Sequence, residues 1–213
     1  MKLPTQIYDL SVLLGIESIN YPTDTPYHRE TIQSLAGGGT CDVSCLTMSP
    51  HAGTHLDAPS HFIAGGRTID SYRVEELILP AQVVEIWDTE AVRAAELEGI
   101  PVKRGDALLF KTANSRTGIN VNGRFNEKYV HLSPDAAEFC VQRGISLVGI
   151  DYVSVERYGD DEFTTHKTLL GKGILLLEGL NLAAAPAGRY TLVCLPLRIA
   201  GAEASPVRAI LLK

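Results

Sequence analysis

No apolar run in the 213 residues approaches the roughly 20 that a membrane-spanning helix needs. The first fifteen residues do not fit a signal peptide, because Asp9 interrupts the apolar run and no small-residue cleavage site follows. Lysine and arginine never cluster, and the formal net charge of −6 argues against a nucleic-acid partner. We therefore expect a cytoplasmic protein that binds neither membranes nor nucleic acids.

Cysteine is scarce, and its spacing excludes the common thiolate sites. The four cysteines form no C-x-x-C pair, so neither a thiolate zinc site nor a redox pair is expected. Cys41 and Cys45 lie in a strand-like segment, where their Cα atoms would be about 13 Å apart, too far for a disulfide. We expect reduced thiols, most of them buried.

Several catalytic motifs are absent. The chain has no G-x-S-x-G nucleophile elbow and no G-x-x-x-x-G-K-[ST] phosphate loop. The glycines at 37–39 and 171–173 lack the strand and helix context of a dinucleotide fingerprint. Ser49, Ser60 and Cys45 lie near histidines, but no third residue with recognisable spacing completes a triad.

The order of predicted elements indicates one α/β domain over residues 1–213 with a sizeable sheet. No repeat, low-complexity tract or linker divides the chain, and the glycines at 36–40 mark a hairpin or a mobile loop. One clear helix follows Ser133 as N-cap and ends at Gly144, and a second is expected over 90–98. Strand-like runs occur at 7–14, 41–49, 81–88, 107–112, 146–151, 174–178 and 190–197.

Half of the six histidines fall into one short stretch, "SPHAGTHLDAPSHF" at 49–62. A glycine and two prolines oppose a helix here, so an extended chain is expected. Residues of equal parity then share a face, and His55 and Asp57 would lie about 6.6 Å apart at their Cα atoms. Bends at Gly53 and near residue 59 would bring His51 and His61 to the same point. The stretch therefore predicts a metal site, with a structural hydrogen-bond cluster as the alternative.

Two later residues could complete such a site. His166 precedes a short helical stretch, and Glu178 ends the apolar strand at 174–178. A carboxylate at the end of a buried strand is costly unless it is paired or bound to a cation. The alternative is that Glu178 forms a salt bridge with Arg198 or Arg208. Imidazole and carboxylate ligands without thiolate suit Zn²⁺, Mn²⁺ or Fe²⁺. The remaining histidines, at 28 and 131, are expected to be exposed.

Taken together, these segments resemble the cyclase/kynurenine formamidase family of metal-dependent hydrolases. The histidine stretch resembles the family signature H-x-G-[TA]-H-x-D-x-P-x-H-[FY]. "YPTDTP" at 21–26 is similar to the family's entry segment, and "GIDYVSVE" at 149–156 to its G-[ILV]-D-x-x-S strand. "THKTLLGKGILLLEGLNL" carries His and Glu twelve residues apart, and "RYTLVCLPLRIAGAEASPVRAIL" resembles the closing strands.

The resemblance implies a swivelling β/β/α architecture with a mixed central sheet, in a homodimer or larger homo-oligomer whose active site lies near a subunit interface. It implies one or two divalent ions per subunit, Zn or Mn. His51, His55 and Asp57 would bind one ion, and Asp57 would bridge to a second ion held by His166 and Glu178. His61 would be the catalytic acid/base. The apolar segment 207–213 gives weak support for the dimer.

The resemblance also implies the reaction. The expected activity is hydrolysis of an amide C–N bond in a small molecule, with N-formylkynurenine as the best candidate substrate. Tyr21 and Phe62 would contact it, although Tyr21 stands where bacterial kynurenine formamidases tend to have Trp. The alternatives are an isatin-type lactam hydrolase or a cyclase on a small carbonyl compound. A non-catalytic metal-binding assembly protein is the alternative of another class, but it would not need His61.

Overall fold

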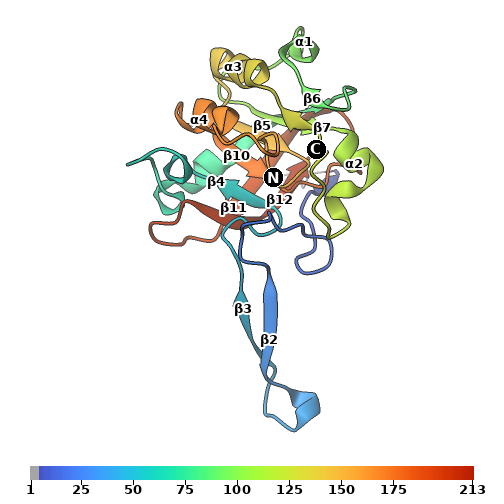
Figure 1. Cartoon of the computed structure of the whole chain (residues 1–213), viewed down its shortest axis with the longest axis vertical. Helices are drawn as coiled ribbons and strands as arrows, with labels where there is room; N and C mark the ends of the chain where they lie inside the picture. Colours follow the sequence, from blue (N-terminus) through green and yellow to red (C-terminus); the bar gives the residue numbers. More distant parts are fainter. Residues whose placement is uncertain (1–4) are drawn as a thin grey trace.

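Short apolar runs and alternating segments form one mixed eight-stranded sheet (Figure 1). A computed structural model describes residues 5–213. The strand order is β1-β12-β11-β5-β7-β9-β10-β4, and β4 also pairs with β12, so the sheet curls back on itself. Neighbours from β5 to β10 run parallel, and the others run antiparallel. The strands are β1 (Ile7–Asp9), β4 (His55–Asp57), β5 (Ile78–Glu85), β7 (Ala107–Lys111), β9 (Leu147–Ile150), β10 (Leu175–Glu178), β11 (Gly188–Pro196) and β12 (Ala204–Leu212).

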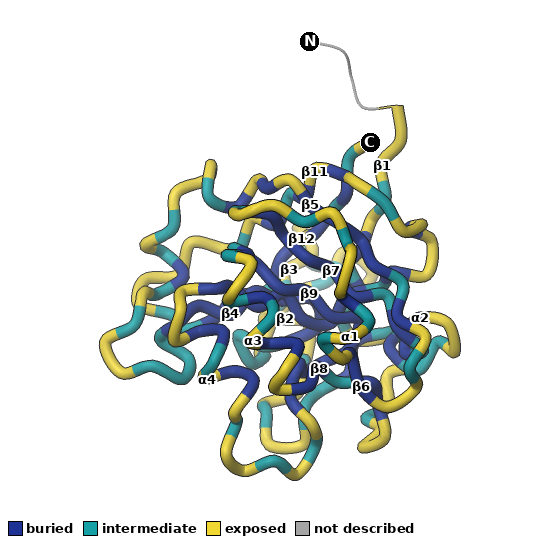
Figure 2. The backbone as a smooth tube through the Cα atoms, turned by 90° about the horizontal axis from the view of Figure 1, so that it is seen from above, coloured by how far each residue is buried: buried dark blue, intermediate teal, exposed yellow. Residues whose placement is uncertain are grey.

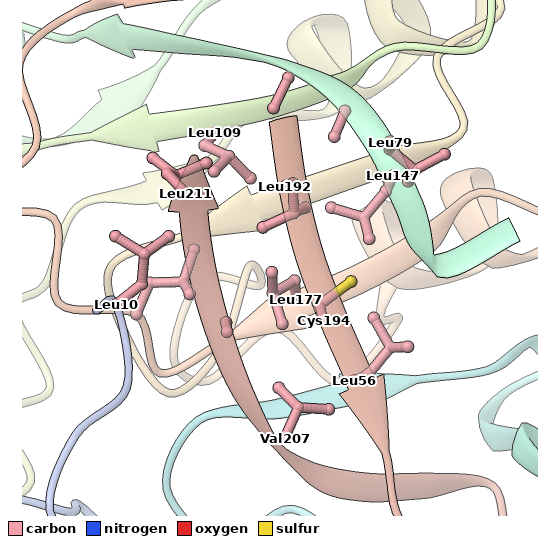
Figure 3. Close-up of a cluster of buried hydrophobic side chains, with 14 of the residues drawn as sticks. Leu10, Leu56, Leu79, Leu109, Leu147, Leu177, Leu192, Cys194, Val207 and Leu211 are labelled. Carbon is pink, nitrogen blue, oxygen red and sulfur yellow. The ribbon is translucent and has the colours of Figure 1, made fainter. Parts of the chain in front are cut away.

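Two apolar cores cover the two faces of this sheet. β9 and β10 are buried along their whole length, as expected for short continuous apolar strands covered on both sides. Inside the curl, leucines from distant strands meet, among them Leu56, Leu177 and Leu192 (Figure 3). On the outer face, β7 and β9 pack with Cys140 of helix α3 (Pro134–Arg143) and Leu169 of helix α4 (Thr164–Leu170). The α/β class and the mixed central sheet predicted from the sequence are confirmed.

Within residues 5–213, four α-helices and five 3₁₀ turns connect the strands. They are α1 (Ala94–Leu97), α2 (Ala113–Thr117), α3 (Pro134–Arg143), α4 (Thr164–Leu170), η1 (Leu35–Gly37), η2 (Pro59–His61), η3 (Ile69–Ser71), η4 (Val74–Leu77) and η5 (Ile119–Val121). The prediction for α3 is confirmed at both ends, since Ser133 is its N-cap and Gly144 its left-handed C-cap. His166 lies inside α4, whereas the sequence placed it before the helical stretch.

The helix expected over 90–98 is wrong in its first half. Ala91 and Val92 form β6 (Ala91–Val92), which pairs in parallel with β8 (His131–Leu132). The side chain of Asp88 accepts hydrogen bonds from the backbone of Glu90 and Ala91 at 2.8 and 3.3 Å, which holds this segment in a turn. Only α1 is helical in this segment. Val92 is held in the pairing with β8, and Val92 and Leu97 are both fully buried in the outer core.

A two-stranded arm projects from the body (Figure 1). It consists of β2 (His28–Gln33) and β3 (Val43–Thr47), which pair antiparallel, with the glycines of 36–40 near its tip. The expectation of a hairpin at these glycines is confirmed. The expectation of mostly buried thiols is wrong for Cys41 and Cys45, which are exposed on the arm, while the other two cysteines are buried.

Burial is concentrated in the strands at the centre of the molecule, and exposed residues gather in the connecting loops (Figure 2). The segment 207–213 belongs mostly to β12, where Val207, Ala209 and Leu211 point into the inner core. It therefore gives no support for a dimer, contrary to the sequence-based expectation. Within residues 5–213, no helix is both long and apolar enough to cross a membrane.

Candidate metal centre

Three separate parts of the fold supply the six predicted site residues. The chain around β4 and η2 carries His51, His55, Asp57 and His61, α4 carries His166, and the end of β10 carries Glu178. β4 pairs antiparallel with β10, and the register places Glu178 directly opposite His55. The sheet therefore assembles a site from residues more than a hundred positions apart.

Two glycines allow the backbone just before β4 to approach the backbone just after β10 closely. Gly53 and Gly179 both have positive φ, at 66°, a conformation that glycine adopts without strain. A Cβ at Gly179 would lie 2.2 Å from the carbonyl oxygen of Gly53, so the two backbones nearly touch. Thr54 fastens them together, because its hydroxyl donates to the carbonyl of Gly179 at 2.6 Å. The bend predicted at Gly53 is present and serves to bring β4 beside β10.

The second predicted bend turns the chain back after β4. Residues 59–61 form η2, and the N–H of His61 donates to the carbonyl of Ala58 at 3.0 Å. The rings of His51 and His61 consequently lie 4.3 Å apart, and those of His51 and His55 5.1 Å apart. The extended conformation holds for β4 itself, while the end of the stretch is a short 3₁₀ turn.

The two carboxylates sit among the imidazoles. Asp57 Oδ1 lies 2.9 Å from His51 Nδ1 and 3.5 Å from His55 Nε2. Glu178 Oε2 lies 3.4 Å from His55 Nε2, and its Oε1 lies 3.5 Å from His166 Nε2. The alternative salt bridge of Glu178 with an arginine is wrong for Arg208, which pairs with Asp9.

The chemistry of these donors fits a divalent cation. Among the described residues, His55 Nε2 and both carboxylate oxygens of Asp57 are buried without a hydrogen-bond partner, which is costly unless a cation completes them. Ligand atoms within 4.8 Å of one another come from His51, Asp57 and His61, and from His55, Asp57 and Glu178. Both groups contain Asp57. This geometry includes His61 among the possible ligands, so the division into ligands and base stays a prediction.

The protonation of the site follows from burial and from charge pairing. Burial alone would lower the pKa of His55, but Asp57 and Glu178 outweigh it and raise that pKa to about 9. Burial is likewise outweighed at His166, where Glu156 and Glu178 raise the pKa to about 10. The neighbouring imidazoles hold the pKa of Asp57 well below its usual range despite its burial. Without an ion, the site therefore balances imidazolium groups against carboxylates.

The pKa of His61 shifts in the opposite direction to those of His55 and His166. Burial lowers its pKa, repulsion from His51 and His166 adds to this, and the attraction of Asp57 does not compensate. A neutral imidazole can accept a proton at neutral pH, whereas His55 and His166, whose pKa values are raised, are already protonated there without an ion. The structure therefore separates His61 electrostatically from His55 and His166.

The site opens into a pocket of about 210 Å³ with aromatic walls. Phe62 packs against Phe163 and His166, with ring centroids 5.1 and 4.7 Å apart. Tyr21 also lines the pocket and contacts Phe125 and Tyr158 edge-on. The predicted substrate residues Tyr21 and Phe62 thus both face the pocket. Its lining consists of Tyr21, Thr23, Asp24, His51, His55, His61, Phe62, Val153, Ser154, Phe163, His166 and Glu178.

Sequence reasoning missed two residues of this site. Glu156 accepts a hydrogen bond from His166 Nδ1 at 2.9 Å, and the motif at 149–156 contained it without giving it a role. Phe163 is the one described non-glycine residue with positive φ, at 50°, which no sequence pattern signals. Of the two histidines expected to be exposed, His28 is exposed, whereas His131 is half-buried in β8.

Comparisons with known proteins agree with this geometry. A family model described as "Putative cyclase" matches residues 8–157. The kynurenine formamidase of Bacillus mycoides (strain KBAB4) is 33% identical over 207 residues, which cover 97% of each chain. The structure of a predicted metal-dependent hydrolase from Bacillus stearothermophilus superposes with a TM-score of 0.82 at 30% identity, covering 97% of each chain. Isatin hydrolase A from Labrenzia aggregata shares the fold, with a TM-score of 0.80 at 23% identity over 97% of this chain and 93% of that one.

Proposed function

This chain belongs to the cyclase family, and from that membership we propose that it is a metal-dependent hydrolase that cleaves an amide C–N bond. The observation that carries the proposal is the convergence of four imidazoles and two carboxylates at one aromatic-walled pocket. The relatives named kynurenine formamidase support a formamide as the substrate. A non-catalytic metal-binding protein would need the ligands but no separate acid/base, and His61, whose pKa is lowered by its burial, suits that second role.

We propose Zn²⁺ or Mn²⁺ as the cofactor, with one or two ions per subunit. His51, His55 and Asp57 would hold the first ion, and His166 and Glu178 would join Asp57 at the second. When bound, such an ion lowers the pKa of water and polarises a carbonyl group. Imidazole and carboxylate donors suit both metals, since neither requires thiolate.

The protein's own contribution to the reaction is proton transfer and orientation. His61, neutral at neutral pH, takes a proton from the water that attacks the carbonyl carbon. As the C–N bond breaks, the same imidazole returns that proton to the leaving nitrogen. The hydroxyl group of the water thereby ends on the carboxylic acid, and its proton ends on the amine. Asp57 and Glu178 keep their negative charge throughout, because their pKa values are lowered despite burial.

N-formylkynurenine is the proposed substrate, and its hydrolysis would give kynurenine and formate. Tyr21, Phe62 and Phe163 all line the pocket and offer flat surfaces to an aryl ring. A lactam fused to an aryl ring, as in isatin, has the same aromatic part. Isatin hydrolysis is therefore the second candidate, and a cyclase reaction on a small carbonyl compound is the third.

A substrate comparison tests the proposal. Zinc- or manganese-loaded protein would be assayed with N-formylkynurenine, formanilide and isatin, with His61→Ala as the matched inactive variant. We expect the highest kcat/KM for N-formylkynurenine and little turnover by the variant. Faster hydrolysis of isatin would identify a lactam hydrolase instead. No turnover of any amide, lactam or lactone by metal-loaded protein would contradict the hydrolase proposal.

We also propose that the protein is a homodimer in which the arm contacts a second copy. All six residues of β2 and four of the five residues of β3 are exposed. Ile32, Val43 and Leu46 on this arm are 60, 44 and 53% exposed. A two-stranded hairpin is only marginally stable alone in water, so we infer that a partner covers it. The arm's base adjoins the pocket, since Ser49 contacts Asp24 at 3.3 Å.

A further inference from the structure

Glu156 is buried beside the site and contacts one of its histidines twice. It is 4% exposed, and it follows β9 on the segment that connects this strand to α4. Its Oε2 accepts from His166 Nδ1 at 2.9 Å and from the backbone N–H of His166 at 3.0 Å. Its Oε1 accepts from the N–H of Thr165 at 3.2 Å. The carboxylate therefore fixes both the backbone and the ring of His166.

The contact to Nδ1 decides which nitrogen of His166 faces the site. With Nδ1–H donating to Glu156, the other ring nitrogen, Nε2, faces Glu178 Oε1, 3.5 Å away. His55 is oriented in the same way, but by a backbone carbonyl, because its Nδ1 lies 2.9 Å from the oxygen of Gly53. A side chain that orients a histidine ligand typically changes metal affinity by 10–100-fold when it is removed.

The same segment also holds the second carboxylate. The N–H of Val155 donates to Glu178 Oε1 at 2.6 Å, one residue before Glu156. Residues 155 and 156 thus contact both side chains assigned to the second ion. We propose that Glu156 is a positioning residue that sets the affinity of the ion bound by His166, independently of the ion bound by His51 and His55. This inference rests on the proposed metal centre.

A purely structural role is the competing explanation. Glu156 also caps the first turn of α4, so its removal could loosen the helix and the whole site together. The two roles differ in what they change. Positioning of His166 alters one metal affinity, whereas loosening of α4 lowers the unfolding temperature of the metal-free protein and disturbs the site generally.

The test is a titration of metal-free protein with Zn²⁺ against a chromogenic chelator. We expect wild type to bind two ions and Glu156→Ala to bind one of them 10–100-fold more weakly, with the other unchanged. Glu156→Gln should lie between, because its amide oxygen can still accept from Nδ1–H. Glu162→Gln is the matched control, since Glu162 is exposed on the same connecting segment and should behave as wild type.

A second control separates helix stability from positioning. Thr165→Val removes the 3.2 Å hydrogen bond from Thr165 to the carbonyl of Leu132 and should lower the unfolding temperature without separating the two zinc affinities. Unchanged affinities in Glu156→Ala, or equal weakening of both ions, would overturn the inference. Wild type that binds no zinc would contradict the metal centre and this inference with it. Wild type that binds zinc but hydrolyses no amide would contradict the proposed reaction alone.

Discussion

At the scale of single residues, Phe163 combines backbone strain with a place in the pocket wall. Its φ of 50° lies in the left-handed region, which costs a non-glycine residue about 1–2 kcal/mol. Such strain persists where the surrounding structure holds it, and it is concentrated at functional sites. The ring lines the pocket and packs on Phe62 with a centroid distance of 5.1 Å. We infer that the strain is retained because it places this ring.

Two substitutions at this position separate strain from contact. Phe163→Gly and Phe163→Ala both remove the ring, so both should raise KM for an aryl substrate. Only glycine relieves the strain, so Phe163→Gly should be more stable than Phe163→Ala by about 1 kcal/mol. Chemical denaturation and steady-state kinetics would measure the two effects. Equal stability of the variants, or an unchanged KM in both, would contradict this role.

The candidate site residues could be predicted from the sequence better than the residues that surround them. The predicted ligands His51, His55 and Asp57 lie close together in the chain, so local geometry was enough to bring them together. Glu156 and His166 meet only because the segment after β9 folds back over α4. That contact depends on tertiary packing, which no local pattern encodes.

At the scale of elements, the close approach between the backbone just before β4 and the backbone just after β10 depends on Gly179. An alanine Cβ there would meet the carbonyl oxygen of Gly53 at 2.2 Å, and neither backbone can move without moving a site residue. Gly173 is a matched control, since its φ is also positive, at 75°, but nothing lies within 4 Å of a Cβ there. Both glycines have positive φ, but only Gly179 has another backbone in the space that a Cβ would fill.

We expect Gly173→Ala to cost about 1 kcal/mol of unfolding free energy and to leave metal binding intact. Gly179→Ala should cost a further 1–3 kcal/mol, roughly, and should weaken zinc binding because it shifts Glu178 away from His55. Denaturant unfolding and zinc titration would be measured on the same preparations. Similar values for both variants would show that the close approach does not matter.

An ion pair between the buried Asp106 and the exposed Arg189 joins the start of β7 to β11. Asp106 is 3% exposed at its side chain, and its two oxygens accept from both terminal nitrogens of Arg189. Burial would raise the pKa of Asp106, but Arg189 and the backbone of Lys103 outweigh it and lower that pKa. A lowered folded-state pKa means that the pair stabilises the fold above the unfolded pKa of about 4. That stabilisation is lost as the pH falls through the folded value.

Asp106→Asn should therefore lower the unfolding free energy by about 2 kcal/mol at pH 7, with the difference from wild type shrinking towards pH 3. Asp9→Asn is the control, because Asp9 pairs with Arg208 at the surface and such pairs contribute under about 1 kcal/mol. Thermal unfolding of metal-free protein from pH 7 to pH 3 measures both. A constant difference across this range would contradict the assignment.

Elements were predictable where the signal was local. Ser133 and Gly144 bound α3 because capping preferences act within one turn. Ala91 and Val92 were misassigned because their partner strand β8 lies forty residues further on. The pairing of β4 with β12, which curls the sheet, also joins segments that no periodicity connects.

At the scale of the whole molecule, the arm is the part that the body does not cover. We expect Ile32→Ser combined with Leu46→Ser to convert the dimer into a monomer, because these apolar side chains would otherwise be buried against the second copy. Light scattering measures the mass, and elemental analysis should show unchanged metal content. Val74→Ser, at a 56% exposed residue off the arm, should stay dimeric. Monomeric wild type, or a dimer in the arm variant, would contradict the proposed contact.

We propose that this site binds a divalent ion for amide hydrolysis and that His61 moves the proton. Metal content and hydrolysis of N-formylkynurenine should be measured in the same samples of wild type, His55→Ala and His61→Ala. His55→Ala should lose metal and activity together. His61→Ala should keep the metal of the first site and lose roughly 10²–10⁴-fold in rate. A metal-free or fully active His61→Ala would contradict the account.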